Sequence, residues 1–147
     1  MAVDVMTEIE IRRPRSEVAA YAVDPDNATS WYANIVEVTW ETPPPLAVGS
    51  RLAFVARFLG RRLAYTYEVV EHDPGTRFVM QTADGPFPMR TTYSWSDTSA
   101  GTLMQLRNDG DPSGFARVSA PMMSSAMRKA NTKDLARLKS LLEGVAS

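Results

Sequence analysis

Hydrophobic and polar residues alternate through most of the first 110 residues, the period expected of half-buried β-strands. Residues 3–12 show it first, with Ile9 and Ile11 among the residues of one face. In residues 36–41 the same reasoning places Val36 on the buried face. The predicted strands after the first cover residues 36–41, 51–58, 63–70, 78–82, 89–96 and 104–108.

Two short helices are predicted between the first and second strands. Residues 15–22 form the first, which ends before Asp24 and Pro25 because the residue before a proline avoids the α region. Residues 26–32 form the second, with Trp31 as its apolar anchor. Both helices therefore precede the main run of strands.

Short turns join the remaining strands. Leu59-Gly60 has the length of a tight hairpin turn. Asp73-Pro74-Gly75 predicts another turn, because proline fixes φ and glycine allows a positive φ. Connections this short favour an antiparallel meander over parallel strands with crossover helices.

After residue 112 the pattern changes to a helical one. Apolar or small residues recur at steps of three and four, and most lysines and arginines lie off this stripe. The stripe consists of Met123, Met127, Ala130, Asn131, Leu135, Leu138 and Leu142. It predicts an amphipathic helix of roughly 22–25 residues, and leaves open whether Pro121 begins that helix or kinks a longer one.

Composition supports one globular domain spanning residues 1–147. The chain is 44% hydrophobic and 22% charged, and its net charge of −1 gives no field that would favour nucleic acid. There are no cysteines, which excludes disulfides and thiolate metal ligands. We expect no signal peptide, no integral membrane association and a cytoplasmic location, because no basic start with an apolar run and no run of 18 apolar residues is present.

The inward face of the predicted sheet is rich in aromatic and methionine side chains, with a few separated amides and hydroxyls. Only one long helix is available to cover it. Such a face fits either a solid core or a pocket for a small molecule. If it is a pocket, the expected ligand-binding residues are Trp31, Trp40, Phe54, Tyr65, Tyr67, Met80, Tyr93, Trp95, Met104, Asn108, Met123, Met127 and Asn131.

A series of short motifs, weak singly but ordered along nearly the whole chain, indicates a family. They occupy residues 11–18, Asp24-Pro25-Asp26 before Trp31, residues 45–50, residues 69–74, Gly101-Thr102 and residues 135–143. In this order the chain resembles the polyketide cyclase/dehydrase and lipid transport branch of the START-like (SRPBCC, helix-grip) superfamily. The resemblance implies an α+β helix-grip fold of order β-α-α-β6-α. In that fold a curved seven-stranded antiparallel sheet wraps around the long C-terminal helix and encloses a deep hydrophobic cavity.

The sequence offers few residues suited to catalysis or metal binding. The only histidine, His72, lies at a predicted strand end, and no group of residues has metal-ligand spacing, so no metal and no cofactor are expected. Inward acid–base candidates are Tyr65, Tyr67 and Tyr93, with Arg90 added if the strand register is shifted by one residue. A tyrosine with its usual pKa of about 10 is a poor base at neutral pH.

The leading hypothesis is therefore a protein that binds a small hydrophobic ligand, lipid-like, polyketide-like or aromatic, in an internal cavity. One alternative is an enzyme of the polyketide cyclase/aromatase type that uses the cavity tyrosines. A second alternative is a protein-interaction module that docks a partner at the cavity mouth. The identity of the ligand, the openness of the cavity and the oligomeric state, including a homodimer, are left open by the sequence.

Overall fold

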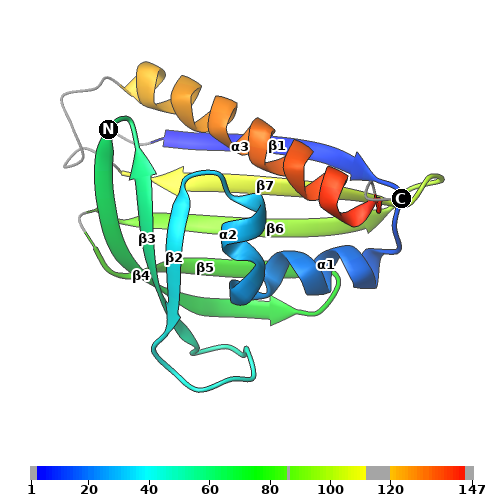
Figure 1. Cartoon of the computed structure of the whole chain (residues 1–147), viewed down its shortest axis with the longest axis horizontal. Coiled ribbons are helices and arrows are strands. Elements are labelled where there is room, and N and C mark those ends of the chain that lie inside the picture. The colour runs from blue at the N-terminus through cyan, green and yellow to red at the C-terminus, as the bar shows by residue number, and fades with distance from the viewer. Residues whose placement is uncertain (1–2, 86, 112–119, 145–147) are drawn as a thin grey trace.

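The structure, a computed structural model, describes residues 3–85, 87–111 and 120–144. Its elements follow the predicted order, with a curved sheet on one side and three α-helices on the other (Figure 1). They are β1 (Val3–Ile11), α1 (Arg15–Val23), η1 (Pro25–Asn27), α2 (Ala28–Trp31), β2 (Ile35–Trp40), β3 (Arg51–Phe58), β4 (Arg61–Asp73), β5 (Arg77–Asp84), β6 (Met89–Asp97), β7 (Thr102–Gly110) and α3 (Ala120–Leu142). The predicted α+β helix-grip architecture is confirmed.

The seven strands form one antiparallel sheet in the order β1-β7-β6-β5-β4-β3-β2. Strands β2 to β7 form the predicted meander, and β1 pairs with the last strand, β7. Register shifts interrupt the β4–β5 pairing between Thr66 and Tyr67 and between Val69 and Glu71. Bulges of this kind bend a strand and increase its twist.

A bulge in β2 overturns one sequence-based prediction. Between Ile35 and Glu37 the pairing with β3 shifts, so that two neighbouring residues share one position in the ladder. Ile35 is consequently buried, whereas Val36 is 51% exposed instead of facing inward. Val38 and Trp40, beyond the bulge, are half-buried as alternation predicted.

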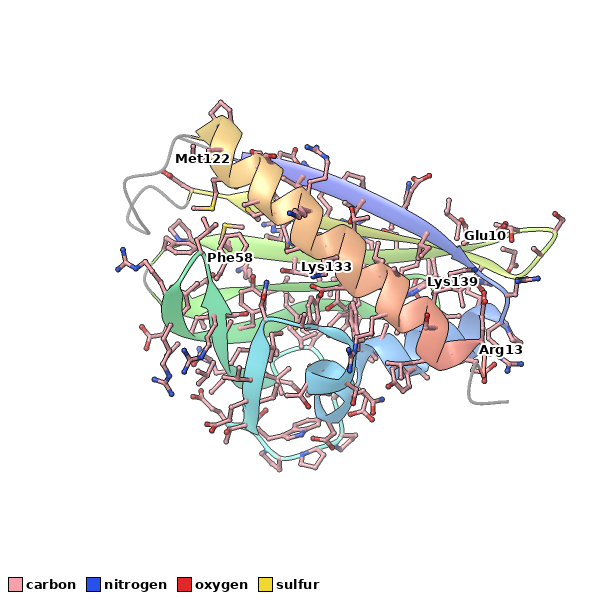
Figure 2. All side chains as sticks on the ribbon, turned by 45° about the horizontal axis from the view of Figure 1, so that its top comes forward. Glu10, Arg13, Phe58, Met122, Lys133 and Lys139 are labelled. Atoms are coloured by element: carbon pink, nitrogen blue, oxygen red, sulfur yellow. The ribbon has the colours of Figure 1, made fainter. Side chains whose placement is uncertain are left out.

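Helix α3 packs against β1 (Figure 1). Its buried face follows the predicted stripe through Met123, Met127, Leu135 and Leu138. Lysines such as Lys133 project from the other side (Figure 2). Residues 112–119 lie outside the described part, and the described part of α3 begins at Ala120, one residue before Pro121.

The C-terminal end of α3 is fastened to the N-terminal part of the sheet. Arg13 Nε donates a hydrogen bond to the Leu142 carbonyl at 2.7 Å, and Lys139 Nζ donates to the Glu10 carbonyl at 2.8 Å. Cations near a helix C-terminus also interact favourably with the helix dipole. These contacts hold one end of α3 against β1 (Figure 2).

Two hydrophobic clusters fill the space between sheet and helices. The larger one includes Trp31, Phe78, Leu106 and Leu138. The smaller one is Val3, Val5, Met123 and Met127, against which Phe58, Leu63, Phe87 and Met89 pack. Across the described residues, no helix combines the length and apolar composition needed to cross a membrane.

Candidate functional site

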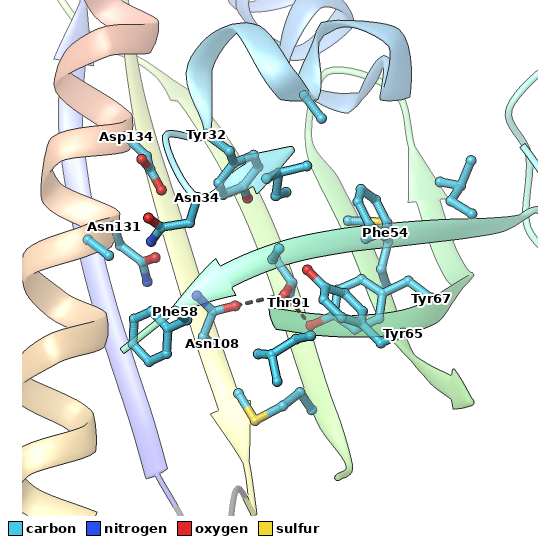
Figure 3. Close-up of a pocket in the computed structure, with 18 of the residues that line it drawn as sticks. Tyr32, Asn34, Phe54, Phe58, Tyr65, Tyr67, Thr91, Asn108, Asn131 and Asp134 are labelled. Atoms are coloured by element: carbon cyan, nitrogen blue, oxygen red, sulfur yellow. Dashed lines mark hydrogen bonds between the residues drawn. The ribbon is translucent and has the colours of Figure 1, made fainter. Parts of the chain in front are cut away.

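A cavity of about 180 Å³ lies between the sheet and α3, at the junction of the two hydrophobic clusters. Strands β3 to β7 supply one wall, α3 the opposite wall, and α1, η1 and α2 close one end (Figure 3). Most lining side chains are apolar or aromatic. Pockets for small molecules combine such walls with a few placed polar groups.

Most of the residues predicted from the sequence come together in this cavity. Those that line it are Phe54, Tyr65, Tyr67, Met80, Tyr93, Asn108, Met123, Met127 and Asn131. The lining residues of the sheet are neighbours because of the strand register. Phe54 pairs with Tyr65 between β3 and β4. Thr91 of β6 pairs with Met80 of β5 and with Asn108 of β7.

Four predicted residues lie elsewhere. Trp31 and Met104 are fully buried in the larger hydrophobic cluster. Trp40 and Trp95 line a second hollow beside α1, and Trp40 Nε1 donates to Asp26 Oδ1 at 3.0 Å. Alternation predicts which face of a strand a side chain lies on, but not whether its position along the strand brings it to the core or to the cavity.

A chain of hydrogen bonds crosses the sheet wall. Thr91 Oγ1 donates to Asn108 Oδ1 at 2.7 Å, and Thr91 Oγ1 lies 3.0 Å from Tyr67 Oη (Figure 3). Because the threonine hydroxyl has one proton, which goes to the amide oxygen, the tyrosine must be the donor to Thr91. The Thr91 hydroxyl thus links the side chains of Tyr67 and Asn108 across three strands of the sheet.

Two further tyrosines meet at the closed end of the cavity. The hydroxyls of Tyr32 and Tyr93 share a short hydrogen bond. Burial raises the pKa of Tyr67 to about 12 and raises the pKa values of Tyr32, Tyr65 and Tyr93 above their usual value as well. These hydroxyls therefore stay protonated at neutral pH and act as hydrogen-bond donors and acceptors.

The polar end of the cavity, formed by Asp134, Asn131, Asn34 and Tyr32, lies against α3 (Figure 3). Asp134 is 3% exposed, and its Oδ1 accepts a hydrogen bond from the Ala33 N–H at 3.0 Å. Burial raises the pKa of Asp134 to about 6, an effect that the Ala33 N–H and two nearby cations only partly oppose.

Sequence reasoning missed the residues of this polar end other than Asn131. Asp134 could have been predicted to face inward from its helical spacing. It lies three residues after Asn131 and seven after Met127, on the buried stripe of α3. Tyr32 and Asn34 lie in the connection between α2 and β2, where no periodicity exists to orient them.

The other chemical candidates lie outside the cavity. Arg90 is exposed and donates to Gln81 Oε1 at 3.3 Å, so the shifted register that would have turned it inward does not occur. His72 is half-buried in β4, with its ring edge-to-face on Phe78 at 5.4 Å. Within the described residues, no group of three or more histidines and carboxylates is arranged to hold a metal ion.

A family model described as polyketide cyclase/dehydrase and lipid transport matches residues 2–143. The chain belongs to this family. Comparison with curated proteins finds no match. Family membership agrees with the resemblance drawn from the motifs, and leaves the ligand and any reaction to be argued from the site.

Solved structures show the same fold at low sequence identity. The protein TTHA0849 from Thermus thermophilus is 18% identical, with a TM-score of 0.80 over 98% of this chain and 99% of that one. A START superfamily protein from Mycobacterium smegmatis is 17% identical, with a TM-score of 0.73 over 96% and 94%. The di-domain ARO/CYC StfQ from the steffimycin biosynthetic pathway is 13% identical, with a TM-score of 0.78 over 99% of this chain and 52% of that one.

Proposed function

We propose that this member of the family binds a compact hydrophobic ligand, about the size of one substituted ring, in the cavity between the sheet and α3. The observation that carries the proposal is the cavity itself, an apolar hollow between the sheet and α3 into which separated polar groups face. A protein core evolved only for stability packs with few voids larger than a water molecule. A void of about 180 Å³ is several times larger than that.

The cavity volume supports a small ligand over a long chain. A cavity of about 150 Å³ lined by aliphatic and aromatic side chains accommodates benzene, whereas drug-sized ligands occupy pockets of roughly 300–1,000 Å³. The present cavity, about 180 Å³, belongs with the first class. Met89, Met123 and Met127 lie in its wall, and their flexible thioethers let the wall adapt to ligands of different outline.

Binding of a graded ligand set tests the proposal. Toluene, 1-naphthol and palmitate are compared by thermal shift and native mass spectrometry, because a ligand that binds only the folded state raises the midpoint with its concentration. We expect toluene to bind and palmitate to bind weakly or not at all. Ala56→Leu, which fills the lining, should abolish binding, and Ala64→Leu on the exposed face of β4 should not. Failure of every compound to bind would contradict the proposal.

A second candidate is an enzyme of the cyclase/aromatase type, and one observation favours it. Asp134 lines the cavity, and its pKa of about 6 is close to the pH at which a general base works best. The tyrosines favour it less, because burial raises their pKa values and keeps them protonated at neutral pH. A poly-β-keto chain would also need more room than the cavity has.

Product formation from a short poly-β-keto thioester tests this candidate. If Asp134 transfers a proton, Asp134→Asn should lower the rate by about 10²–10⁴-fold. Tyr65→Phe should change the rate far less. Wild-type protein that binds toluene but forms no product above the uncatalysed background would exclude the enzyme and leave the binding function.

A further inference from the structure

The carboxylate of Asp134 is buried and has no salt-bridge partner among the described residues. Its Oδ1 is held by the Ala33 N–H. Its two basic helix neighbours act on it only through space: Lys133 is exposed, and Arg137 Nε donates to the Ser30 carbonyl. An ionised carboxylate has about four acceptor sites, and the Ala33 N–H occupies one of them.

The rest of the cavity offers no positive charge either. Among its described lining residues there is no lysine, arginine or histidine. The other lining carboxylate, Asp24, accepts the Asp26 N–H at 3.0 Å as the cap of η1. A ligand that reaches the polar end therefore meets the Asp134 carboxylate directly, whereas Lys133 and Arg137 are not among the residues that line the cavity.

Asn131 is a second, independent sign of an absent partner. Its side chain is 6% exposed, lines the cavity one turn before Asp134, and its amide nitrogen has no hydrogen-bond partner among the described residues. Buried side-chain amides are nearly always hydrogen-bonded. Rotation of the amide by 180° exchanges its nitrogen and oxygen, so it can present either a donor or an acceptor to a bound group.

We infer that the ligand carries a protonated amine on its compact apolar skeleton, and that Asp134 is the acceptor and counter-charge of that amine. The inference rests on the proposed binding function and names the ligand class. An ammonium group has three N–H donors. Asp134, the amides of Asn34 and Asn131, and the lone pairs of Tyr32 surround the polar end and supply the acceptors (Figure 3).

A matched series of probes tests the inference by isothermal titration calorimetry. The probes are 2-phenylethylamine, 2-phenylethanol and phenylacetate, which share a benzyl group and differ in the charge of the terminal group. At pH 7.5 we expect the amine to bind at least about tenfold more tightly than the alcohol, the increment of one charge-assisted hydrogen bond. Phenylacetate should bind weakest, because its charge repels Asp134.

Two variants assign the preference to one carboxylate. Asp134→Asn keeps the volume and the acceptor for the Ala33 N–H, and should lower the affinity for the amine to that for the alcohol. Glu37→Gln removes one negative charge from the exposed face of β2 and should keep the wild-type preference. An amine preference that survives Asp134→Asn would overturn the inference.

A pH series tests the same point without a variant. Lowering the pH from 7.5 to 5 protonates Asp134, so wild-type protein should lose most of its amine preference, while Asp134→Asn shows little change. The groups that face Asp134 and share its field are Lys133 and Arg137 on α3, Tyr32 after α2 and Tyr93 on β6. Burial raises the pKa values of the two tyrosines, so both stay protonated over this range.

The outcomes separate this inference from the proposed function. Amine and alcohol binding equally well, or toluene binding while neither does, would overturn the inference and leave the binding function in place. Failure of every probe and of every compound in the graded set would overturn both.

Discussion

The buried polar side chains of the cavity are the residues on which the proposed recognition depends. Tyr67, Thr91 and Asn108 hydrogen-bond to one another, whereas Asp134 and Asn131 are only partly hydrogen-bonded by the residues that the structure describes. Satisfied groups stabilise the fold, and partly satisfied ones are available to a ligand. The two kinds of residue should therefore respond differently to substitution.

Asp134 should make stability depend on pH in an unusual direction. Its pKa is raised to about 6 in the folded state, above the ordinary carboxyl value of about 3.9, so the folded protein holds the proton more tightly. This group therefore stabilises the fold at low pH and loses that contribution as pH rises from about 4 to 6. Asp134→Asn should be about 1–2 kcal/mol more stable than wild type at pH 7.5 and about equal at pH 4. Urea unfolding at both pH values measures the difference, and a constant difference would contradict it.

Removal of the Thr91 hydroxyl should break the sheet-wall network. Thr91→Val is nearly isosteric and leaves the Asn108 oxygen without its donor and the Tyr67 hydroxyl without its acceptor. We expect a loss of about 1–3 kcal/mol in the free energy of unfolding. Thr39→Val, on the exposed face of β2, should change it by less than about 0.5 kcal/mol. Equal effects of the two substitutions would show that the network adds nothing.

At the scale of elements, α3 joins the two clusters and forms the cavity wall between them. Leu138 is fully buried and Leu141, one turn later, is 44% exposed. Leu138→Ala should cost about 2–5 kcal/mol because it removes buried methyl groups and leaves a void, whereas Leu141→Ala should cost less than about 0.5 kcal/mol. Chemical denaturation of the two variants measures the contrast, and a similar loss in both would contradict the orientation of α3.

The β3–β4 hairpin has a local strain that can be relieved. Leu59 adopts φ 51° and Gly60 φ 76°, the pair of positive values that a tight hairpin turn requires. Leucine rarely takes this conformation, and asparagine takes it readily. Leu59→Asn should therefore raise the free energy of unfolding by about 0.5–1 kcal/mol, measured by thermal denaturation. No gain would mean that contacts of the exposed leucine offset its strain.

At the scale of the whole molecule, the cavity is unfilled apolar space, which lowers the stability that close packing would give. Ala56→Leu adds apolar volume to the lining and should stabilise the unliganded protein by about 1 kcal/mol. Ala64→Leu adds the same volume to the exposed face of the neighbouring strand and should have little effect. Thermal midpoints of both variants provide the comparison, and a destabilised Ala56→Leu would indicate that the space is too constricted to fill.

Alternation along the chain was enough to predict the order of elements and most of the inward faces. The prediction succeeded because a half-buried strand must place every second side chain in the core, and because the stripe of α3 repeats at helical steps. It was wrong at Val36, where the β2 bulge adds one residue and reverses the alternation. Such a bulge is a property of two paired strands, and a single strand's pattern does not contain it.

The sequence alone determined the fold class, the family and the aromatic and methionine character of the inward face, because these follow from local periodicity and ordered motifs. Only the tertiary structure decided that space is left inside, since packing density depends on how the sheet curves against α3. It also separated cavity residues such as Tyr67 from core residues such as Trp31. Finally, it brought Asp134 to Asn34 and Tyr32 from a distant part of the chain, and long-range contacts of that kind leave no periodic signal.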